Sequence, residues 1–379
     1  MNAATRPTSP APAPADWQRL LSGVARSFAL SVKVLPTHLR APVTLGYLLA
    51  RASDTLADSV PAGTQAMGEA DLRVQALAEL RRCIAQVPQG RIALELDLPK
   101  VAQCLPGIAS APERLLLQRL PEVLQSMGQL SPSDQQLIGK VCETIASGQE
   151  LDLLRFGAGA AQVQGLSDQT ELDDYTWRVA GCVGQFWTDL AESHLSDWRS
   201  HPLSNMQHAA KRYGMGLQRL NLWRDSAADL AQGRCYWPAD RLAQHGLEAA
   251  TLAQAVAQRD MAVLARMGPC ISQGLSEIRR DLSWGLAYSL AVRPWRLRMA
   301  SAPPALIGLR TVQALESAGI DALLQSVRVP RSWVRGLMLK LMLGGLTIAG
   351  LSALGRSVGA LRVTDWARPS GPADGTISP

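Results

Sequence analysis

Aromatic side chains and charges are scarce in this sequence. Aromatic residues make up 5% of it and charged residues 18%, against 47% apolar residues. No run of five or more consecutive lysines and arginines occurs, and the basic residues are scattered along helical patterns. A nucleic-acid-binding surface gathers basic residues into a patch or stripe, so we expect no nucleic acid partner. The net charge of +6 favours an anionic lipid or a phosphorylated small molecule instead.

Metal-ligand motifs and an export signal are also lacking. The six cysteines show no Cys-x-x-Cys spacing, and no two histidines lie four residues apart, which argues against a zinc site. We interpret the cysteines as buried thiols of a cytoplasmic protein. Residues 1–16 lack the apolar core of a signal peptide and are rich in Pro and Ala, which predicts a disordered arm. Residues 364–379 predict a disordered tail.

The alternation of polar and apolar residues that is typical of strands is nearly absent. Apolar residues recur at helical spacing, as in Leu116, Leu120 and Leu124. No repeat of fixed period and no wide linker interrupts this pattern. We therefore predict an all-α protein with about twelve helices in a single domain over residues 17–360. Breaks are expected at prolines, among them Pro202, Pro294 and the pair Pro303-Pro304.

Two aspartates stand four residues apart in the first chemical motif, Arg51-Ala-Ser-Asp54-Thr-Leu-Ala-Asp58. On a helix, Tyr47, Arg51, Asp54 and Asp58 share one face. Like charges at this spacing destabilise a helix unless something compensates them. Mg²⁺ is bound in proteins by one or two carboxylates together with substrate phosphates. The motif is therefore a candidate half-site for a diphosphate, with a solvated helix face as the alternative.

A second polar stripe lies about 170 residues further along the chain. It runs from Gln218 to Asp229 and is followed by Gly-Arg-Cys-Tyr-Trp-Pro. One helical face carries Gln218, Asn221, Asp225 and Asp229, and Arg224 and Arg234 flank it. Arginine binds phosphate oxygens well because its guanidinium presents a fixed fork of donors. Two such stripes in so apolar a chain suggest two helices that face a common cavity.

Several motifs in order resemble the squalene/phytoene synthase family of head-to-head prenyltransferases. They are Arg26-Ser27-Phe28, Asp54–Asp58, Tyr175-Thr-Trp-Arg-Val-Ala-Gly181, Gln218–Asp229 and Pro303-Pro-Ala-Leu306. The resemblance implies a class I isoprenoid synthase fold, with the two aspartate motifs on opposite walls of a central apolar cavity. The implied reaction joins two allylic diphosphates and leaves a carbocation in a dry pocket.

The resemblance also implies roles for individual residues. Mg²⁺ would be held by Asp54, Asp58, Asp225 and Asp229. The substrate diphosphate would be bound by Arg26, Ser27, Arg51, Arg224, Arg234, Gln218 and Asn221. Tyr47 and Tyr175 would lie close to the carbocation, where aromatic faces stabilise positive charge.

The chain departs from the family pattern at three positions. Many relatives carry Glu where this chain has Ala57 and Ala228, and Arg178 occupies a position whose identity varies between squalene-forming and phytoene-forming relatives. The expected reaction is condensation of two farnesyl diphosphates to presqualene diphosphate and on to squalene. A phytoene synthase acting on geranylgeranyl diphosphate, and a noncatalytic lipid-binding or assembly protein of the same fold, are the alternatives.

Two further segments lead to expectations about partners. Residues 337–354 are apolar with one lysine and are flanked by arginines at 331, 335, 356 and 362, which predicts a core or interfacial helix, with a membrane span as the alternative. We expect peripheral association with the inner membrane. Reduction to squalene would require NADPH, and Arg328 and Arg331 are the candidate contacts for it. Gly181-Cys-Val-Gly184 follows no strand, so we interpret it as a site of close helix packing and not as a dinucleotide loop.

Overall fold

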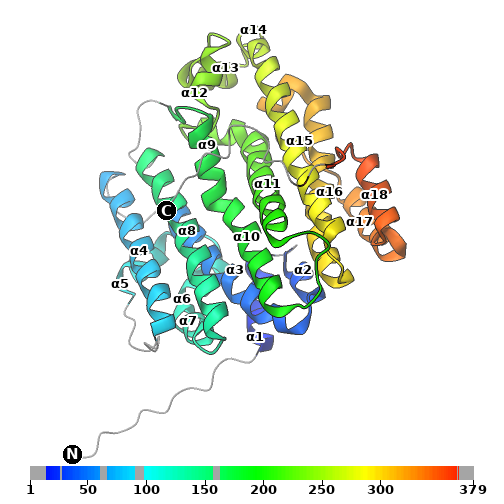
Figure 1. The fold of residues 1–379 in the computed structure, drawn as a ribbon. Helices are drawn as coiled ribbons and strands as arrows, with labels where there is room; N and C mark the ends of the chain where they lie inside the picture. The colour runs from blue at the N-terminus through cyan, green and yellow to red at the C-terminus, as the bar shows by residue number, and fades with distance from the viewer. Residues whose placement is uncertain are drawn as a thin grey trace, which may run out of the picture. The chain divides into compact units, whose positions relative to one another are not determined.

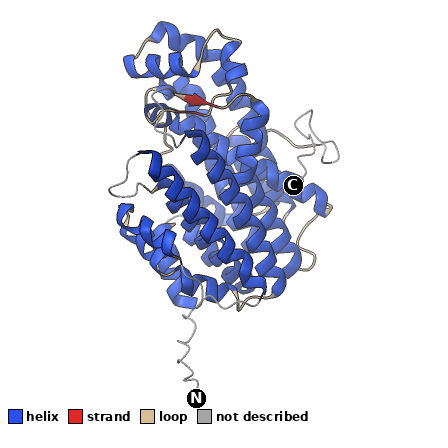
Figure 2. Cartoon of the chain, turned by 90° about the vertical axis from the view of Figure 1, so that its left-hand side faces the viewer, coloured by secondary structure: helices blue, strands red, loops and turns tan. Residues whose placement is uncertain are grey.

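The structure is a computed structural model of the 379-residue chain. It describes residues 14–25, 28–59, 66–89, 98–156, 163–364 and 366. The prediction of an all-α fold is confirmed, because helices make up nearly all of the regular structure in these ranges (Figures 1 and 2). The described residues form the α-helices α1 to α18, which is more than the twelve or so expected. Helices as short as α12 (Ala239–Ala243) and α14 (Met261–Leu264) leave no periodic pattern in the sequence.

The chain divides into two compact units. The first comprises residues 1–33 and 37–146, and the second residues 34–36 and 147–379. The described helices of the first unit are α1 (Pro14–Val24), α2 (Phe28–Val34), α3 (Thr37–Asp58), α4 (Ala66–Gln86), α5 (Pro99–Cys104), α6 (Ala111–Gln118), α7 (Leu120–Met127) and the beginning of α8 (Pro132–Phe156). Helix α1 begins at Pro14, before the domain start predicted at residue 17.

The second unit holds the longer helices. In order they are the end of α8, α9 (Gln169–Thr176), α10 (Cys182–His194), α11 (Leu203–Ala231), α12, α13 (Ala249–Gln258), α14, α15 (Gly268–Ala291), α16 (Trp295–Ala318), α17 (Arg331–Lys340) and α18 (Ile348–Ser357). Two short strands, β1 (Gln164–Gly165) and β2 (Arg234–Cys235), pair in parallel. Helices α10, α11, α15 and α16 lie side by side (Figure 1).

Glycines set the distance between α11 and the segment packed on it, which consists of the π-helical turn Trp177–Gly181 and α10. A Cβ atom on Gly184 would lie 2.1 Å from the carbonyl oxygen of Ala210, and one on Gly214 would lie 2.3 Å from that of Ala180. Only glycine permits so close an approach of two backbones. The prediction that Gly181 and Gly184 serve close helix packing is therefore confirmed. All six cysteines are free and buried, as the spacing indicated.

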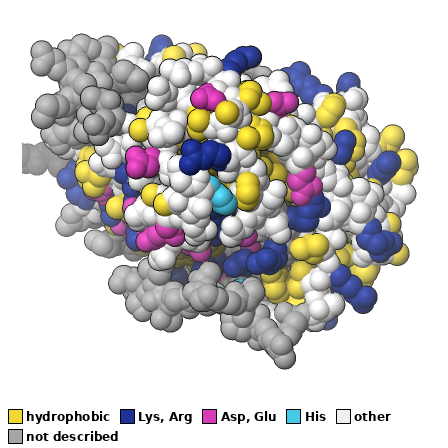
Figure 3. All heavy atoms as spheres, turned by 90° about the horizontal axis from the view of Figure 1, so that it is seen from above, with side chains coloured by type: hydrophobic (Ala, Val, Ile, Leu, Met, Phe, Trp, Pro, Cys, Tyr) yellow, Lys and Arg dark blue, Asp and Glu magenta, His cyan; other side chains and the backbone are white. Residues whose placement is uncertain are grey.

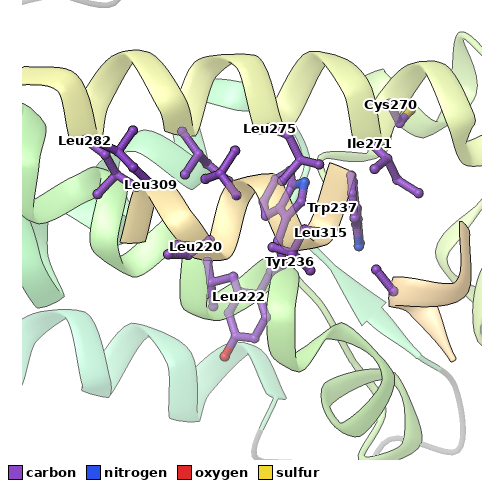
Figure 4. Packing of buried hydrophobic residues seen from close by; sticks show 14 of the residues in the cluster. Leu220, Leu222, Tyr236, Trp237, Cys270, Ile271, Leu275, Leu282, Leu309 and Leu315 are labelled. Carbon is purple, nitrogen blue, oxygen red and sulfur yellow. The ribbon is translucent and has the colours of Figure 1, made fainter. Parts of the chain in front are cut away.

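An apolar core fixes α11 between its neighbours. Trp223 of α11 packs on α15 at Gly274, where a Cβ atom would lie 2.6 Å from the indole ring. The Trp223 and Trp237 rings lie 4.2 Å apart, and the Trp237 indole N–H donates to the Ser226 hydroxyl at 3.2 Å. Figure 4 shows Trp237 among the leucines of α11, α15 and α16. One face of α11 is therefore anchored while its polar face is left available.

A buried ion network also anchors α11. Asp281 of α15 is fully buried and pairs with Arg212 at 2.6 Å and with Arg219 at 2.5 Å. Arg219 reaches Asp173 of α9 at 2.5 Å as well. Two positive and two negative groups thus compensate each other, which is the condition under which charges are tolerated inside a protein.

The expected break at Pro303-Pro304 is wrong. Helix α16 runs from Trp295 to Ala318 through both prolines. Each proline removes one backbone hydrogen bond, but the helix is buried along most of its length, and Ala302, Ala305 and Leu306 are fully buried. The Tyr213 hydroxyl also donates to the Ser301 carbonyl oxygen at 2.9 Å. Packing and this additional hydrogen bond keep the segment helical.

The prediction of one apolar helix over residues 337–354 is also wrong. Helix α17 ends at Lys340, a π-helical turn spans Leu341–Gly345, and α18 begins at Ile348. The interruption falls at Gly344, whose φ of 112° lies outside the helical range and suits glycine. Among the described residues no helix has the length and apolar character needed to cross a bilayer.

Candidate active site

The polar face of α11 carries the second aspartate motif. Gln218, Asn221, Asp225 and Asp229 follow one another along this face, as helical spacing predicts. The Arg224 guanidinium donates to both oxygens of Asp225, at 2.9 and 2.6 Å. The Asp225 side chain is 43% exposed and so remains open to solvent and ligands. Asp225 therefore offers carboxylate oxygens at the surface of the face.

Asp229, one turn further along α11, lies in a less polar environment. Burial, together with the charges of Asp225 and Asp152, raises the pKa of Asp229 to about 6 against an opposing effect from Arg234. A raised carboxyl pKa means that the negative charge is poorly compensated by the protein. A cation bound at this position would supply the missing compensation.

Asp152, near the end of α8, joins this cluster. It accepts hydrogen bonds from the Tyr236 hydroxyl at 3.0 and 2.8 Å and lies 4.0 Å from the Arg234 guanidinium. The strand pair β1–β2 holds Arg234 in place, because Arg234 pairs with Gln164. In this neighbourhood three carboxylates, of Asp152, Asp225 and Asp229, face two guanidiniums, of Arg224 and Arg234. The set therefore has an excess of negative charge.

Aromatic rings border the carboxylates. Tyr236 stacks on Tyr175 with ring centroids 5.3 Å apart, and Phe156 meets Tyr236 edge-on at 5.2 Å. In Figure 4 the Tyr236 hydroxyl lies at the end of the ring away from Trp237 and Leu275. Burial raises the pKa of Tyr236, so its phenol stays protonated and donates. Polar and apolar surfaces thus meet at these three rings.

A π-helical turn follows Tyr175. Residues Trp177–Gly181 form this turn between α9 and α10. Such turns occur mostly as single turns and frequently at functional sites. Arg178, within the turn, donates to Asp174 at 2.8 Å and to the Ser147 hydroxyl at 3.0 Å. The Arg178 guanidinium therefore links α9 to α8, an interaction that the sequence did not indicate.

The first unit contains the other predicted set, on α3. Tyr47 stacks on Phe28 at 4.6 Å, and burial raises the pKa of its hydroxyl. Arg51 is paired with Glu113 of α6 and lies 3.7 Å from Asp54. Asp54 is 44% exposed, and Asp58, one turn further on, is exposed at the end of the helix. These four predicted residues lie along one face of α3.

Of the remaining predicted residues, two lie in the described part of the chain. Arg26 and Ser27 lie outside the described residues. Arg328 and Arg331 are exposed and lie just before and at the start of α17, where Arg328 donates to the Ser326 hydroxyl at 3.3 Å.

Sequence reasoning missed two neighbours of the predicted residues. Tyr236 belongs to the cluster through its hydrogen bonds to Asp152, which stands 84 positions away in the chain. Glu113, the partner of Arg51, lies 62 positions from it. Tyr236 stands two residues after Arg234 in the Gly-Arg-Cys-Tyr-Trp-Pro segment, which is the one local signal that pointed to it.

The donor set on α11 suits a hard divalent cation. Carboxylate oxygens at adjacent helical turns are the ligands that Mg²⁺ prefers, with substrate phosphates and waters completing the shell. Within the described ranges no group of three or more His, Cys, Asp or Glu is arranged as a ready metal cage. A site of two aspartates that is completed by a diphosphate fits both observations. The residues present are thus compatible with Mg²⁺.

A family model described as "Squalene/phytoene synthase" matches residues 21–335, which is most of the chain. The chain belongs to the squalene/phytoene synthase family. A squalene synthase of Saccharomyces cerevisiae is 26% identical over 60% of this chain and 46% of its own length. A bifunctional lycopene cyclase/phytoene synthase of Colletotrichum graminicola is 28% identical over 60% of this chain and 35% of its own length. The chain spans about half the length, or less, of these curated relatives.

Solved structures agree with the squalene/phytoene synthase fold. A ligand complex of TcSQS superimposes with a TM-score of 0.69 at 21% identity and covers 91% of this chain and 90% of that chain. The prediction of a squalene synthase-type isoprenoid synthase fold is confirmed by this similarity. At such identity the likeness establishes the fold alone.

Proposed function

We propose that this protein is a prenyltransferase that condenses two farnesyl diphosphates head to head, to presqualene diphosphate and on to squalene, with Mg²⁺. One observation carries the proposal: the Asp229 carboxyl, whose pKa is raised by burial and by the charges of Asp225 and Asp152, belongs to a carboxylate cluster that hydrogen-bonds the stacked ring pair of Tyr175 and Tyr236 through Asp152. A diphosphate with a bound cation needs the first feature, and an allylic carbocation needs the second. Membership of the family supports the same reaction.

The α11 residues would bind and orient the diphosphate. Asp225 and Asp229 would hold the cation, and Gln218 and Asn221 on the same face would donate hydrogen bonds to phosphate oxygens. When bound, Mg²⁺ supplies charge stabilisation of the diphosphate leaving group. Arg234 lies beside Asp152 and would add a second positive charge toward the same oxygens. Arg224 is paired with Asp225, so it would have to release Asp225 to contact a phosphate. Substrate binding would therefore break this ion pair.

The aromatic residues would protect and stabilise the carbocation. Tyr175 and Tyr236 present stacked rings, and ring faces attract cations. The Tyr236 hydroxyl is held by Asp152, so the ring is fixed in orientation. Burial of these side chains excludes water, which would otherwise capture the cation as an alcohol.

On α3 the proposed roles are parallel. Asp54 and Asp58 would bind Mg²⁺, and Arg51 would contact the diphosphate while Glu113 holds its guanidinium. Tyr47 would face a carbocation from its stacked position on Phe28. Arg26 and Ser27 keep their proposed role as phosphate ligands on the strength of the sequence alone.

The second candidate function is phytoene synthesis from two geranylgeranyl diphosphates. It is favoured by the similarity to a bifunctional lycopene cyclase/phytoene synthase. A noncatalytic lipid-binding role would follow from the alanines at 57 and 228, but the carboxylate cluster on α11 supports catalysis.

We propose further that the enzyme acts in the cytoplasm, peripherally attached to the inner membrane, because its substrates and product are lipids. Residues 17–360 would form the catalytic domain, and the ends proposed as disordered are residues 1–13, because α1 begins at Pro14, and residues 364–379. If the reaction proceeds to squalene, NADPH would be held through Arg328 and Arg331, whose exposed side chains suit loose phosphate contacts.

The deciding experiment incubates the purified protein with farnesyl or geranylgeranyl diphosphate, with and without Mg²⁺ and NADPH, and identifies the products. Squalene from the C15 substrate with Mg²⁺ and NADPH is the expected result. Presqualene diphosphate at saturating NADPH would limit the enzyme to the first half-reaction, and phytoene from the C20 substrate alone would establish the second candidate. No product from either substrate would refute the catalytic proposal.

A further inference from the structure

One segment near the end of the described residues is basic throughout. Residues 322–364 contain six basic residues and no acidic one, whereas the rest of the chain has 32 of each sign. The whole net charge of +6 therefore belongs to this segment, which forms α17, the π-helical turn and α18. Such a segment attracts anionic surfaces.

Exposed apolar side chains lie in the same segment. Among the described residues, ten large apolar side chains are exposed, and five of them belong here: Leu339, Met342, Leu343, Ile348 and Leu361. Leu343, at 77%, is the most exposed of the ten. Figure 3 shows hydrophobic and basic side chains together at the right-hand edge of the molecule, on the side where Figure 1 places α17 and α18. Apolar groups beside cations are typical of membrane-interface elements.

Between α15 and α18 lies a cavity of about 520 Å³. Leu286, Ala287 and Leu290 of α15 form an apolar wall, and Ser352 and Arg356 of α18 face it. Arg362 lines the cavity from the segment after α18. Within the described part of the chain, neither guanidinium has a hydrogen bond or an ion pair, whereas most other arginines of this unit are paired. The volume suits a ligand of small-molecule size.

The walls of the cavity are held in place. A Cβ atom on Gly355 would lie 2.2 Å from a methyl carbon of Leu286, so α18 approaches α15 as closely as glycine allows. The Leu361 amide donates to the Ser283 hydroxyl at 2.9 Å, and Arg279 donates to the Gly359 carbonyl oxygen at 2.8 Å. These contacts fix the residues that carry Arg356 and Arg362. The cavity is therefore part of the folded unit.

We propose that this cavity binds one anionic phospholipid of a membrane leaflet, with its phosphate between Arg356 and Arg362 and an acyl chain along Leu286 and Leu290. The cavity offers two cations at its edge and apolar surface within, which matches an anionic amphiphile. The neighbouring exposed side chains of the segment require an apolar cover, and a bilayer supplies one. The proposal extends the peripheral association proposed above by naming the place where a lipid is held.

The test is cosedimentation of the full chain with vesicles of phosphatidylcholine, alone or mixed with phosphatidylglycerol. The wild type should bind the mixed vesicles and leave phosphatidylcholine vesicles in solution. Each cation near an anionic surface contributes about fivefold in affinity, so Arg356→Gln/Arg362→Gln should bind about 30-fold more weakly. The matched control Lys140→Gln/Arg259→Gln removes two exposed cations that do not line the cavity and should bind as the wild type does. Equal losses in both double variants would overturn the proposal.

A second variant separates a lipid held in the cavity from general attraction of charge. Ser352→Trp fills the cavity and leaves every charge in place, and it should reduce binding at least tenfold. Unchanged binding would show that charge alone acts and would overturn the cavity assignment. Thermal unfolding checks the fold of each variant, and the smaller Ser352→Leu replaces the tryptophan if that variant unfolds early. Displacement of wild-type protein from the vesicles by farnesyl diphosphate would assign the cavity to a prenyl diphosphate instead.

Failure here and failure of the catalytic proposal are distinguishable. Asp225→Asn should lose turnover and keep vesicle binding, while the Arg356→Gln/Arg362→Gln variant should keep turnover in detergent and lose vesicle binding. Absence of vesicle binding by the wild type would refute both the peripheral association and the cavity, and leave the catalytic assay untouched.

Discussion

Helix α11 carries charged side chains on two faces, and the charges are fully paired on one face and incompletely paired on the other. On its buried side Arg212 and Arg219 are matched by Asp281 and Asp173, so that positive and negative groups are equal in number. On its polar side Asp225 and Asp229, together with Asp152, outnumber the nearby arginines. Complete pairing serves stability, whereas incomplete pairing leaves a free-energy gain for a ligand that brings positive charge. The difference predicts which substitutions harm the fold and which harm only the chemistry.

The largest expected effect is on the paired side. Asp281→Asn leaves Arg212 and Arg219 buried without their shared counter-charge and should lower the free energy of unfolding by about 3–5 kcal/mol. Urea denaturation followed by circular dichroism measures it. Asp321→Asn, at an exposed position, is the control and should change stability by less than about 0.5 kcal/mol. Similar losses of unfolding free energy in the two variants would show that the buried ion network does not stabilise the fold.

On the polar side the effect should appear in turnover and not in stability. Asp225→Asn keeps the shape of the side chain and removes one charge from the proposed cation site, and kcat should fall by about 10²–10³. Steady-state kinetics at saturating Mg²⁺ measures the effect, and the exposed residue Asp240 of α12, changed to Asn, is the control. If kcat is unchanged, Asp225 is not a ligand of the cation.

Helical periodicity in the sequence was sufficient to predict which residues share the polar face of α11. It placed Asp225 and Asp229 on one face, because residues three and four apart on a helix are neighbours whatever the tertiary fold. Of the two carboxylates that raise the pKa of Asp229, Asp225 is on the same helix, whereas Asp152 comes from α8, and no local pattern specifies that Asp152 lies near Asp229. The helix through Pro303-Pro304 and the interruption at Gly344 were missed for the same reason. Tertiary packing decided the first, and a single glycine conformation decided the second.

The raised pKa of Asp229 predicts a pH dependence of stability. A folded-state pKa of about 6, above the ordinary value of 3.8, means that the folded protein holds this proton more tightly than the unfolded chain. Stability from this group is therefore present at low pH and is lost as the pH rises toward and past 6. At pH 7 Asp229→Asn should be more stable than the wild type by about 1 kcal/mol, a value reduced for partial solvation.

Thermal melts of Asp229→Asn and the wild type between pH 4 and pH 8 test this point. The stability difference should grow with pH, and Mg²⁺ with diphosphate should raise the Tm of the wild type more at pH 7.5 than at pH 5.5, because proton and cation compete for Asp229. A difference that does not depend on pH would show that Asp229 is compensated after all.

The smallest expected effect concerns the link between Asp152 and Tyr236. Tyr236→Phe removes the hydroxyl that donates to both carboxylate oxygens and leaves the ring stack on Tyr175. Stability should fall by about 1 kcal/mol. kcat should fall less than tenfold, because the ring remains. Tyr236→Leu, which also removes the aromatic face, should lower kcat further, and equal kcat values for the two variants would exclude a role for the ring.

The glycine contact between α10 and α11 has a consequence for how this helix pair can vary. Alanine is the smallest replacement for glycine, and at Gly184 and Gly214 even its single methyl group would overlap a backbone carbonyl group of the facing helix. Backbone cannot rotate away as a flexible side chain does, so no conservative substitution exists at either position. A single substitution at either site is therefore expected to give a protein that cannot keep this helix packing. Single substitutions at these glycines therefore cannot change the distance between the two helices in small steps. New substrate preferences must arise from substitutions at other positions of α10 and α11.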